Sequence, residues 1–400
     1  MKTVFKRSDI VAVVVSIIAA VSICGCSQKS EGLKVIDIGN AYEERTPVMA
    51  SEYFSSIEYV PIETSEGTLL NGVQALELIP SEDRVFIVSR SFNSRSCEIK
   101  SFDYTGKALE FKAQYGRAEN EYGNVHKVMV NGNDVFVMEQ SRILVYDLDG
   151  NFKLTIPLTG VAMSMNRPFL VKDREFGILA DDYKEKKLFI DCIDSTGKRT
   201  YGEPVFSYSG EGGTPRYINR GGVNLPLMPI SPGSLYCNNK EVFIMLKAND
   251  TLYTISRETF QKSPEYLFDY GKYQDPDSKK RVTFLLETPK FLMTNVLFSR
   301  DLFNSPDDYL NPPFIYDYAT GRNRVLTYNE EMKLSGFVND LNDDALIFMP
   351  KVCVGNIMCQ LFDAIDFIDM AEKSNSSKIK EVAAKLTEES NPVLVIGTLK

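Results

Sequence analysis

Residues 125–158 are the most constraining stretch of this chain, because short apolar runs alternate there with turn residues and no helical period is present. The runs occupy 126–130, 135–138, 142–146 and 152–157. Two of the connections, 131–134 and 147–150, contain Asn, Asp and Gly, which accept positive φ in tight hairpin turns. The stretch therefore predicts a four-stranded antiparallel meander whose inner strands are buried on both faces.

A turn with an Asp and a Gly recurs along the chain, at 103–106, 147–150, 194–197 and 317–321. Gly106, Gly150 and Gly197 follow one another at intervals of 44 and 47 residues. Such a period fits a four-stranded propeller blade and is too long for a helical or leucine-rich repeat. Blade-like sets at 73–118, 122–160, 165–210, 230–270, 291–330 and 333–400 predict an all-β, six-bladed β-propeller of antiparallel blades.

Strand-like segments near both ends of the chain have no local partner. They lie at 33–38 and 57–62 near the start and at 393–397 near the end. Pairing of N- and C-terminal strands in one blade would close the ring and remove exposed sheet edges. Before the last strand, Ile379, Val382, Ala383 and Leu386 recur at helical spacing, which predicts short helices near the C-terminus.

The N-terminus resembles a bacterial lipoprotein signal. Residues 1–7 are basic, 10–23 are almost wholly apolar, and the small residue Gly25 precedes Cys26. The apolar run is about 14 residues, shorter than the roughly 20 that a spanning helix needs. We expect a signal peptide at 1–25, lipid attachment at Cys26, a short tether at 26–32 and one propeller domain at 33–400. The alternative is ordinary cleavage near Gly25, which would release a soluble periplasmic protein.

Charge and cysteine content exclude several classes. The formal charge is -9, and cleavage removes three basic residues and one acidic residue, which leaves -11 without any basic block. Nucleic-acid binding is therefore disfavoured. Five cysteines remain after processing, widely spaced, and do not predict a disulfide framework. Cys353 and Cys359 flank Gly355-Asn356. A two-residue loop there would place Cys353 opposite Met358, and a three-residue loop would align the two cysteines.

Catalytic signatures are few. His126 is the single histidine, so a His-rich metal site cannot be assembled, and we expect neither a metal nor another cofactor. For His126 a place in the core or in the lining of a channel is a simpler interpretation than a role as catalytic base. The sequence lacks a Gly-x-Ser-x-Gly elbow, and 147–158 has Phe and Leu where a calcium loop requires Gly and Glu.

One glycine-flanked segment predicts a ligand site. Arg216, Tyr217 and Arg220 lie between Gly212-Gly213 and Gly221-Gly222, and the two arginines reverse the local sign of an acidic chain. Paired guanidinium groups suit a carboxylate or another anion. The alternative is a long inter-blade connection whose arginines pair with acidic neighbours.

Several strand and turn segments resemble the six-bladed β-propeller lipoproteins of Bacteroidota cell envelopes, which are distantly similar to NHL-repeat propellers. The matching segments are 53–64, 101–106, 249–253, 268–273 and 391–394. The family's Gly-x-Gly-Pro-Gly-Glu-Tyr loop corresponds to residues 116–122, where the first Gly, the Glu and the Tyr remain. The resemblance implies an envelope protein that binds something on the propeller face.

Two functional classes follow from these features. The favoured one is a lipid-anchored envelope protein, expected at the outer membrane, that binds or scaffolds a glycan, a peptide or a partner protein without catalysis. The alternative is a hydrolase or lyase that acts on a glycan or peptide with carboxylates at the central funnel. Two carboxylates close together beside a deep pocket would favour the enzyme, and a shallow face would favour binding.

Overall fold

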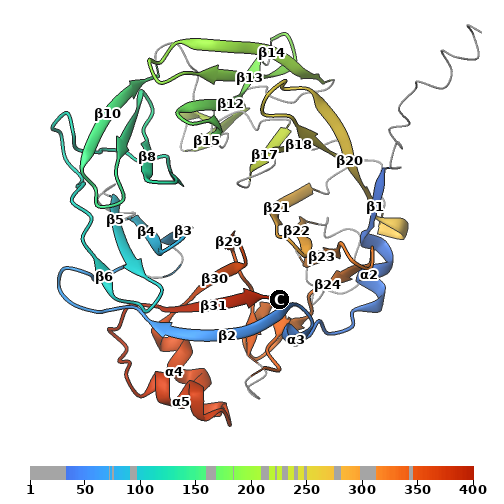
Figure 1. The fold of residues 1–400 in the computed structure, drawn as a ribbon. Helices are drawn as coiled ribbons and strands as arrows, with labels where there is room; N and C mark the ends of the chain where they lie inside the picture. Colours follow the sequence, from blue (N-terminus) through green and yellow to red (C-terminus); the bar gives the residue numbers. More distant parts are fainter. Residues whose placement is uncertain are drawn as a thin grey trace, which may run out of the picture. The chain divides into compact units, whose positions relative to one another are not determined.

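Six small antiparallel sheets stand around a central axis in the computed structural model (Figure 1). The structure describes residues 33–71, 73, 76–90, 97–158, 168–182, 184–208, 216–220, 223–227, 233–237, 242–246, 250–273, 281–297, 312–341 and 346–400. The chain divides after Lys34, and Val35–Lys400 is one compact unit. The predicted six-bladed propeller is confirmed, whereas the predicted signal peptide, Cys26 and the tether lie outside the described residues.

The first three blades follow one another directly in the chain, each from its innermost to its outermost strand. Blade one comprises β3 (Leu76–Pro80), β4 (Arg84–Arg90), β5 (Cys97–Asp103) and β6 (Ala108–Leu109). Blade two comprises β7 (Lys127–Asn131), β8 (Asp134–Met138), β9 (Arg142–Tyr146) and β10 (Phe152–Pro157). Blade three comprises β11 (Phe169–Lys172), β12 (Glu175–Asp182), β13 (Lys187–Ile193) and β14 (Arg199–Ser207).

Two of the other three blades, blades four and six, include a strand from the start of the chain. Blade four comprises β17 (Gly233–Cys237), β18 (Val242–Leu246), β19 (Thr251–Ile255), β20 (Lys262–Asp269) and, outermost, β1 (Lys34–Asp37). Blade five comprises β21 (Arg281–Glu287), β22 (Phe291–Leu297), β23 (Pro313–Asp317) and β24 (Asn323–Val325). Blade six comprises β29 (Val352–Val354), β30 (Ile357–Phe362), β31 (Val393–Leu399) and β2 (Phe54–Pro61).

The sixth blade closes the ring as predicted. β2 pairs with β31 from Phe54↔Leu399 to Pro61↔Val393, and β31 pairs on its other side with β30. The first N-terminal strand does not take part in this closure. β1 instead adds a fifth strand to blade four, next to β20. Blade five also begins earlier than the predicted residue 291, because Arg281–Glu287 pairs with β22.

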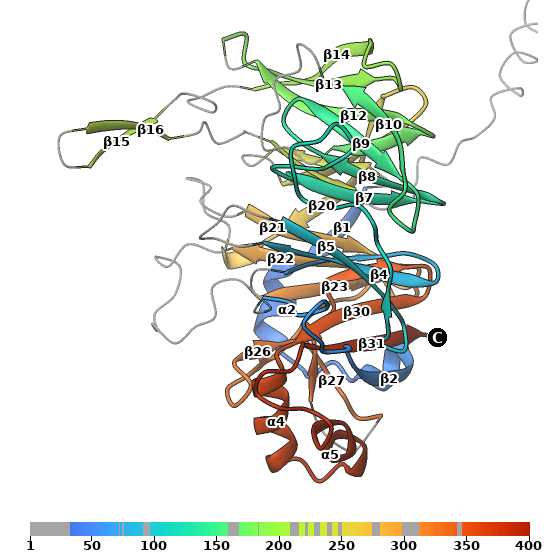
Figure 2. The same cartoon turned by 90° about the vertical axis from the view of Figure 1, so that its left-hand side faces the viewer.

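Short helices and small sheets decorate the connections. Two helices, α4 (Ala364–Lys373) and α5 (Ser377–Ala383), join β30 to β31 where the sequence predicts them. Asp363 caps α4 by accepting the N–H of Ile365 at 3.1 Å, and Phe367 and Ile379 are fully buried beside blade six. Figure 2 shows both helices below that blade.

Three other kinds of element were not predicted: two N-terminal helices, a 3₁₀ turn and two-stranded sheets. The helices α2 (Ile38–Glu44) and α3 (Ala50–Tyr53) precede β2, and the 3₁₀ turn η2 (Gly271–Tyr273) follows β20. Three two-stranded sheets lie in the connections between blades. The connection from blade three to blade four contains β15 (Arg216–Arg220) paired with β16 (Val223–Leu227). The connection from blade five to blade six contains β25 (Tyr328–Asn329) paired with β26 (Leu334–Ser335), and β27 (Phe337–Val338) paired with β28 (Ile347–Phe348).

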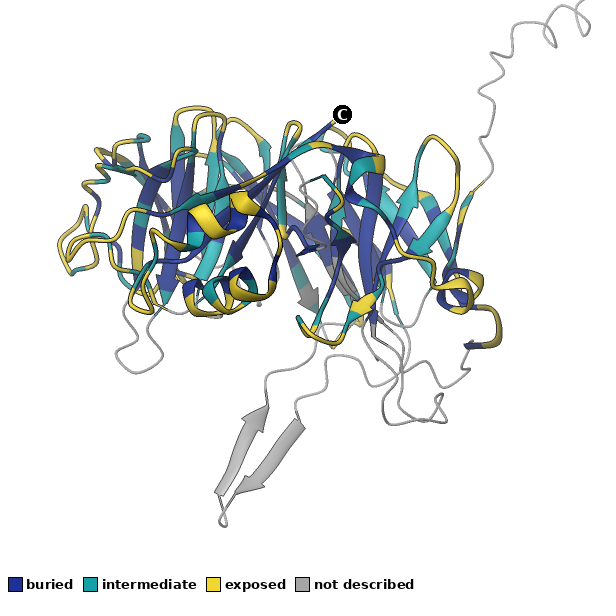
Figure 3. Ribbon diagram, turned by 90° about the horizontal axis from the view of Figure 1, so that it is seen from below, coloured by how far each residue is buried: buried dark blue, intermediate teal, exposed yellow. Residues whose placement is uncertain are grey.

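The core lies between neighbouring blades. Apolar side chains of blades one and two, such as Phe86, Val88, Val128 and Val137, form one buried cluster. Phe136 and Phe176 continue the contact between blades two and three with ring centroids 5.1 Å apart, edge to face. Figure 3 shows the resulting pattern, with buried strands and exposed turns. Each blade therefore depends on its neighbours for burial, and the ring is stable only when it is complete.

The recurring Asp and Gly turn is a joint between blades. In blade two the Asp147 carboxylate accepts the N–H groups of Asp149 and Asn151 at 3.0 and 2.8 Å. Gly150 has φ +79°, and a Cβ there would lie 2.4 Å from the Lys112 nitrogen at the end of blade one. A Cβ added at Gly106 or Gly197 would likewise lie 2.2 Å from a backbone carbonyl oxygen of the preceding blade, that of Pro61 or Pro157 respectively. Glycine thus allows the turns at Gly106, Gly150 and Gly197 to contact the preceding blade through backbone atoms, whereas a Cβ at Gly321 would meet only the Tyr316 hydroxyl of its own blade, at 3.8 Å.

These turns predict acid sensitivity. Burial alone would raise the pKa of Asp147, but hydrogen bonds from Asn151 and Asp149 outweigh it and hold that pKa below the ordinary 3.8. The lowered pKa means that the contribution to stability is complete above about pH 4 and is lost as the pH falls through the folded-state pKa. We expect the melting temperature to fall below pH 4. Asp147→Asn should flatten this dependence, and an identical pH profile for the two proteins would contradict the assignment.

Candidate ligand-binding cavity

A cavity of about 930 Å³ lies among the innermost strands. Its size suits a small ligand or an oligomer fragment. Residues of β3, β7, β11, β21, β29 and β30 contribute to the lining, and β3 contacts β7 and β29 directly. The described lining residues with ionisable or hydrogen-bonding side chains are Glu77, His126, Lys127, Asn131, Arg257, Lys351, Cys353 and Gln360.

Connectivity places several of these residues at one end of the ring. Lys351 directly precedes β29, His126 directly precedes β7, and Lys127 is the first residue of β7. In a four-stranded meander, the start of the innermost strand and the connection between the second and third strands lie at the same end. This is the end at which α4 and α5 leave blade six. Cationic side chains therefore gather at the end that bears the helices.

Glu77 joins blades one and two through an ion-pair network. Its carboxylate accepts Lys127 Nζ at 2.5 Å and Arg90 Nη2 at 3.0 Å. Burial alone would raise the pKa of Glu77, but the Lys127 ammonium and the hydrogen bonds from Lys127 and Arg90 hold it below its usual value. Glu77 is the one carboxylate among the described lining residues, and it is already occupied by two cations.

Lys351 has a different environment. Its backbone N–H donates to the Cys359 carbonyl at 2.9 Å, which fixes the residue beside β30. The side chain is exposed to the cavity, and partial loss of hydration inside the ring lowers the pKa of its ammonium group. Among the described residues, its Nζ atom has neither an ion-pair nor a hydrogen-bond partner. A ligand anion could therefore contact this group without displacing a protein carboxylate.

The rest of the cavity lining combines one further cationic side chain with apolar side chains. Arg257 follows β19 and donates through Nη1 to the Leu170 carbonyl of β11, so a third cation enters the lining. Apolar surface is supplied by Met129, Phe169, Leu285, Leu286 and Leu334. Lys127, Arg257 and Lys351 thus face a single carboxylate among the described lining residues, beside an apolar wall.

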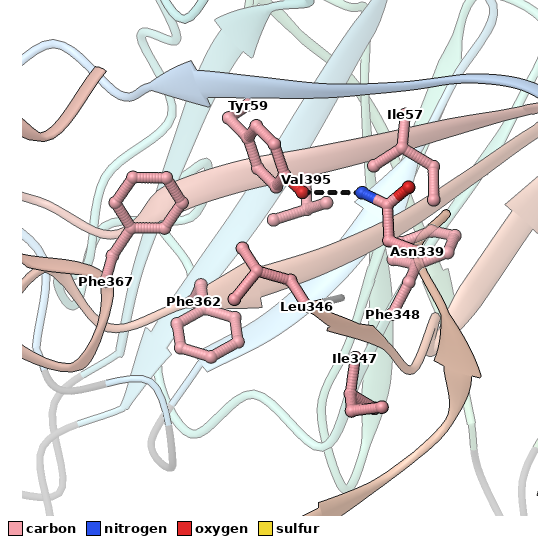
Figure 4. A pocket seen from close by; sticks show the side chains of 9 residues that line it. All are labelled: Ile57, Tyr59, Asn339, Leu346, Ile347, Phe348, Phe362, Phe367 and Val395. Atoms are coloured by element: carbon pink, nitrogen blue, oxygen red, sulfur yellow. Dashed lines mark hydrogen bonds between the residues drawn. The ribbon is translucent and has the colours of Figure 1, made fainter. Parts of the chain in front are cut away.

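A second, much smaller pocket lies beneath the helices. It has a volume of about 10 Å³, and Ile57, Tyr59, Asn339, Phe348 and Val395 are among its lining residues (Figure 4). Asn339 is fully buried and donates to the Tyr59 hydroxyl at 2.7 Å. This volume holds about one water molecule, so the pocket is too small for an organic ligand.

The residues predicted from the sequence fall in three places. His126 lines the cavity with an exposed side chain, which agrees with the channel-lining interpretation. Arg216, Tyr217 and Arg220 lie on β15, which pairs with β16 from Arg216↔Leu227 to Arg220↔Val223. This part of the connection is a hairpin, not an irregular loop. The side chains of these three residues lie outside the described part of the structure, so their role as a ligand site stays a prediction.

The register of β29 and β30 decides between the two loop lengths considered for Cys353 and Cys359. Cys353 pairs with Met358 across a two-residue loop, and Cys97, Cys192, Cys353 and Cys359 are free thiols. The possible bridge between Cys353 and Cys359 is therefore not formed. Burial raises the pKa of the Cys353 thiol to about 11, so this lining residue is protonated at neutral pH.

Hydrogen bonds and close packing within residues 116–122 give a structural role to the three residues that this loop shares with the family motif. The Glu121 carboxylate accepts the N–H groups of Arg117 and Ala118 at 2.8 and 2.9 Å. Tyr122 is buried, and its hydroxyl accepts the N–H of Ile99 at 3.1 Å. A Cβ at Gly116 would overlap the Glu121 carboxylate, at 1.9 Å. The three retained motif residues therefore stabilise the link between blades one and two.

A metal site is not formed by the described residues. In these ranges, no three His, Cys, Asp or Glu side chains form a group that could hold a metal ion. No helix in the same ranges is both long and apolar enough to cross a membrane.

Comparison with known proteins identifies the family. No curated protein matches the chain. A family model described as "Domain of unknown function (DUF4934)" matches residues 33–398. The chain belongs to the DUF4934 family. The match covers the propeller, and it leaves the predicted similarity to lipoproteins and to NHL-repeat propellers as predictions.

One solved structure similar to this DUF4934 chain shares its fold at low sequence identity. A Bacteroides fragilis NCTC 9343 protein described as exported has a TM-score of 0.62 and 14% identity, covering 92% of this chain and 100% of that chain. The Pan2 WD40 domain of Neurospora crassa has a TM-score of 0.35 and 12% identity, covering 70% and 74%. The first similarity shows the shared fold, and the second carries no argument about this chain.

Proposed function

We propose that this DUF4934 protein is a non-catalytic binding protein of the cell envelope that holds an anionic ligand with an apolar body in its central cavity. The observation that carries the proposal is the charge of the lining. Among the described lining residues, Lys127, Arg257 and Lys351 face the cavity together with one carboxylate, Glu77, which Lys127 and Arg90 already neutralise. The whole chain has a formal charge of -9, so the cavity reverses the sign of the protein.

The same lining argues against the hydrolytic alternative. General acid and base catalysis on a glycan requires two carboxyl groups within about 5–9.5 Å of each other. Glu77 has no second carboxylate beside it among the described lining residues, and its lowered pKa disfavours a role as general acid. The cavity, at about 930 Å³, is large enough for an enzyme pocket, but its described polar groups are those of an anion site.

The envelope location rests on the N-terminus and on similarity. The predicted signal peptide at 1–25 with Cys26 would export the chain and anchor it to a membrane by lipid. The similar Bacteroides fragilis protein, described as exported, supports the same location. A carboxylate-bearing glycan or peptide is the ligand class that fits this compartment. Arg216, Tyr217 and Arg220, on the connection from β14 to β17, stay a separate predicted site for an anion.

The test compares acids with their neutral counterparts. Trigalacturonate and octanoate would be titrated against the protein by calorimetry, each beside its methyl ester or amide. We expect the acids to bind and the neutral analogues not to bind. Lys351→Met should weaken the acids by roughly 10- to 100-fold, because a hydrogen bond to a charged group contributes about 1.5–3 kcal/mol.

The matched control is Lys373→Met, which removes an exposed lysine that pairs with Glu331 outside the cavity. Binding should be unchanged in this variant. Equal affinity for the acids and their neutral analogues, or equal affinity in wild type and Lys351→Met, would overturn the proposal.

A further inference from the structure

Gln360 of β30 is a buried amide whose donor group is unused. Its side chain lines the cavity and is only 6% exposed. The Oε1 atom accepts the backbone N–H of Met349 at 2.8 Å, and because a backbone N–H can only donate, this bond fixes which arm of the amide carries the oxygen. The other arm is Nε2, and it donates no hydrogen bond to any residue that the structure describes.

Solvent reaches this donor through the cavity. Polar atoms that are both unpartnered and cut off from solvent do occur in the described part of the chain, Ser101 Oγ among them, but Gln360 Nε2 is not one of these. Since Gln360 lines the cavity, the small exposed part of its side chain opens there. An enclosed donor needs an acceptor, either a water molecule or a ligand oxygen that displaces the water. A ligand without such an oxygen would leave the amide unpaired and bind more weakly.

Gln360 is a neighbour of Lys351 across the hairpin of β29 and β30. Val352 pairs with Cys359, and Lys351 and Gln360 are the next residues beyond that pair. The Lys351 N–H also donates to the Cys359 carbonyl at 2.9 Å. Neighbouring residues on paired strands have side chains that begin roughly 5–8 Å apart, and both of these side chains line the cavity. A carboxylate at Lys351 and a neutral acceptor at Gln360 can therefore belong to one small ligand.

Apolar surface adjoins the same amide. Met358 and Gln360 alternate along β30 and so share a face, and Met358 is buried in the cluster that joins blades five and six. Leu286 of β21 and Leu334 of β26 pack against that cluster and line the cavity. β21 also contacts β29 directly. An alkyl group that continues beyond the oxygen bound by Gln360 would lie against these leucines.

We infer that the cavity binds N-acylated amino acids, with the carboxylate at Lys351, the amide oxygen at Gln360 Nε2 and the acyl chain on Leu286 and Leu334. The inference rests on the proposed function and adds a neutral acceptor to the anion and the apolar body. In an acylated amino acid the amide oxygen and the carboxylate are about one residue of extended chain apart, roughly 3.5 Å. Such a spacing suits two neighbouring side chains. Gln360 is then the residue that separates acylated amino acids from plain fatty acids.

The test compares two acids of equal chain length. N-octanoylglycine and undecanoate have the same number of chain atoms, but only the first carries an amide oxygen. Each would be titrated by calorimetry against the wild type and Gln360→Met, whose side chain has a similar length without the donor. The measured quantity is the ratio of the two affinities, and its change between the proteins cancels the greater hydrophobicity of undecanoate. We expect Gln360→Met to lower the preference for octanoylglycine by roughly 5- to 100-fold, because the variant leaves the ligand oxygen unpaired.

Gln114→Met is the matched control. Gln114 is an exposed residue outside the cavity lining, and its Nε2 atom donates to Glu121 at 2.9 Å, so this variant should keep the wild-type ratio. Lys351→Met should weaken both acids alike, because both carry the carboxylate. An unchanged ratio in Gln360→Met would overturn the role of Gln360 and leave the anion site in place. If neither acid binds the wild type, the proposed function falls as well.

Wild-type crystals soaked in N-octanoylglycine give a second test that does not depend on the folding of a variant. We expect the amide oxygen of the ligand within hydrogen-bond distance of Gln360 Nε2 and its carboxylate at Lys351. A bound ligand whose amide oxygen lies elsewhere, with only water at Gln360 Nε2, would overturn the inference.

Discussion

A chain that ends at Asn391, without β31, is expected not to fold. β31 is the strand between β30 and β2, so its loss leaves β2 without any partner in blade six. Five of its side chains, Val393, Leu394, Val395, Ile396 and Leu399, are at most 7% exposed. Burying an aliphatic side chain contributes about 1.5–3 kcal/mol. The loss is then roughly 7–15 kcal/mol, as large as the whole stability of an ordinary protein.

The measurement is solubility and resistance to trypsin. The shortened chain should be insoluble or rapidly degraded. A peptide of residues 391–400, added during refolding, should restore part of the protease-resistant product by supplying the missing strand in trans. Removing Lys400 alone is the control and should leave a resistant protein. A shortened chain as resistant as the parent would show that the ring does not depend on closure by β31.

Gly150→Ala is expected to destabilise the protein by roughly 3–5 kcal/mol. Two costs combine here. The φ of +79° disfavours any residue with a Cβ by about 1–2 kcal/mol. The added Cβ would also lie 2.4 and 2.6 Å from the nitrogens of Lys112 and Ala113, so blade one must shift. That movement strains the hydrogen bond from Lys112 N–H to the Asp149 carbonyl, now 2.9 Å.

Gly132→Ala is the matched control for this prediction. Gly132 has φ +52° in the hairpin turn of the same blade, and a Cβ there would meet nothing within 4 Å. Gly132→Ala should therefore lower the free energy of unfolding only by the cost of the positive φ, about 1 kcal/mol. Denaturant unfolding of both variants gives the comparison. Equal destabilisation would mean that the joint between blades contributes nothing beyond backbone strain.

The repeated unit could be predicted from the sequence because its determinants are local. Period-two alternation and the turns at Gly132 and Gly150 specify a hairpin within a few residues, and the observed register of blade two follows them. Closure of the ring could be inferred because residues 57–62 and 393–397 had no other partner. The position of β1 could not, since β20, its neighbour in blade four, lies far along the chain and no local pattern indicates that pairing.

The site was harder to predict for a related reason. Lys127 and Lys351 are ordinary residues at strand starts, and only the closed ring brings the innermost strands together around one cavity. The signal available in the sequence was a lysine at the start of two innermost strands, Lys127 in β7 and Lys351 directly before β29. Arg216 and Arg220 were predicted as a site from local charge alone, and local charge carries no information about where a residue lies in the ring.

The central claim is that the cavity at the axis is an anion site organised by Lys351. Anomalous diffraction from crystals soaked in sodium bromide tests it most directly, because bromide reports positive potential without any assumption about the natural ligand. We expect a bromide ion within ion-pair distance of Lys351 Nζ in the wild type and no ion there in Lys351→Met. Bromide bound only on the outer surface of the wild-type ring, with none at Lys351, would contradict the claim.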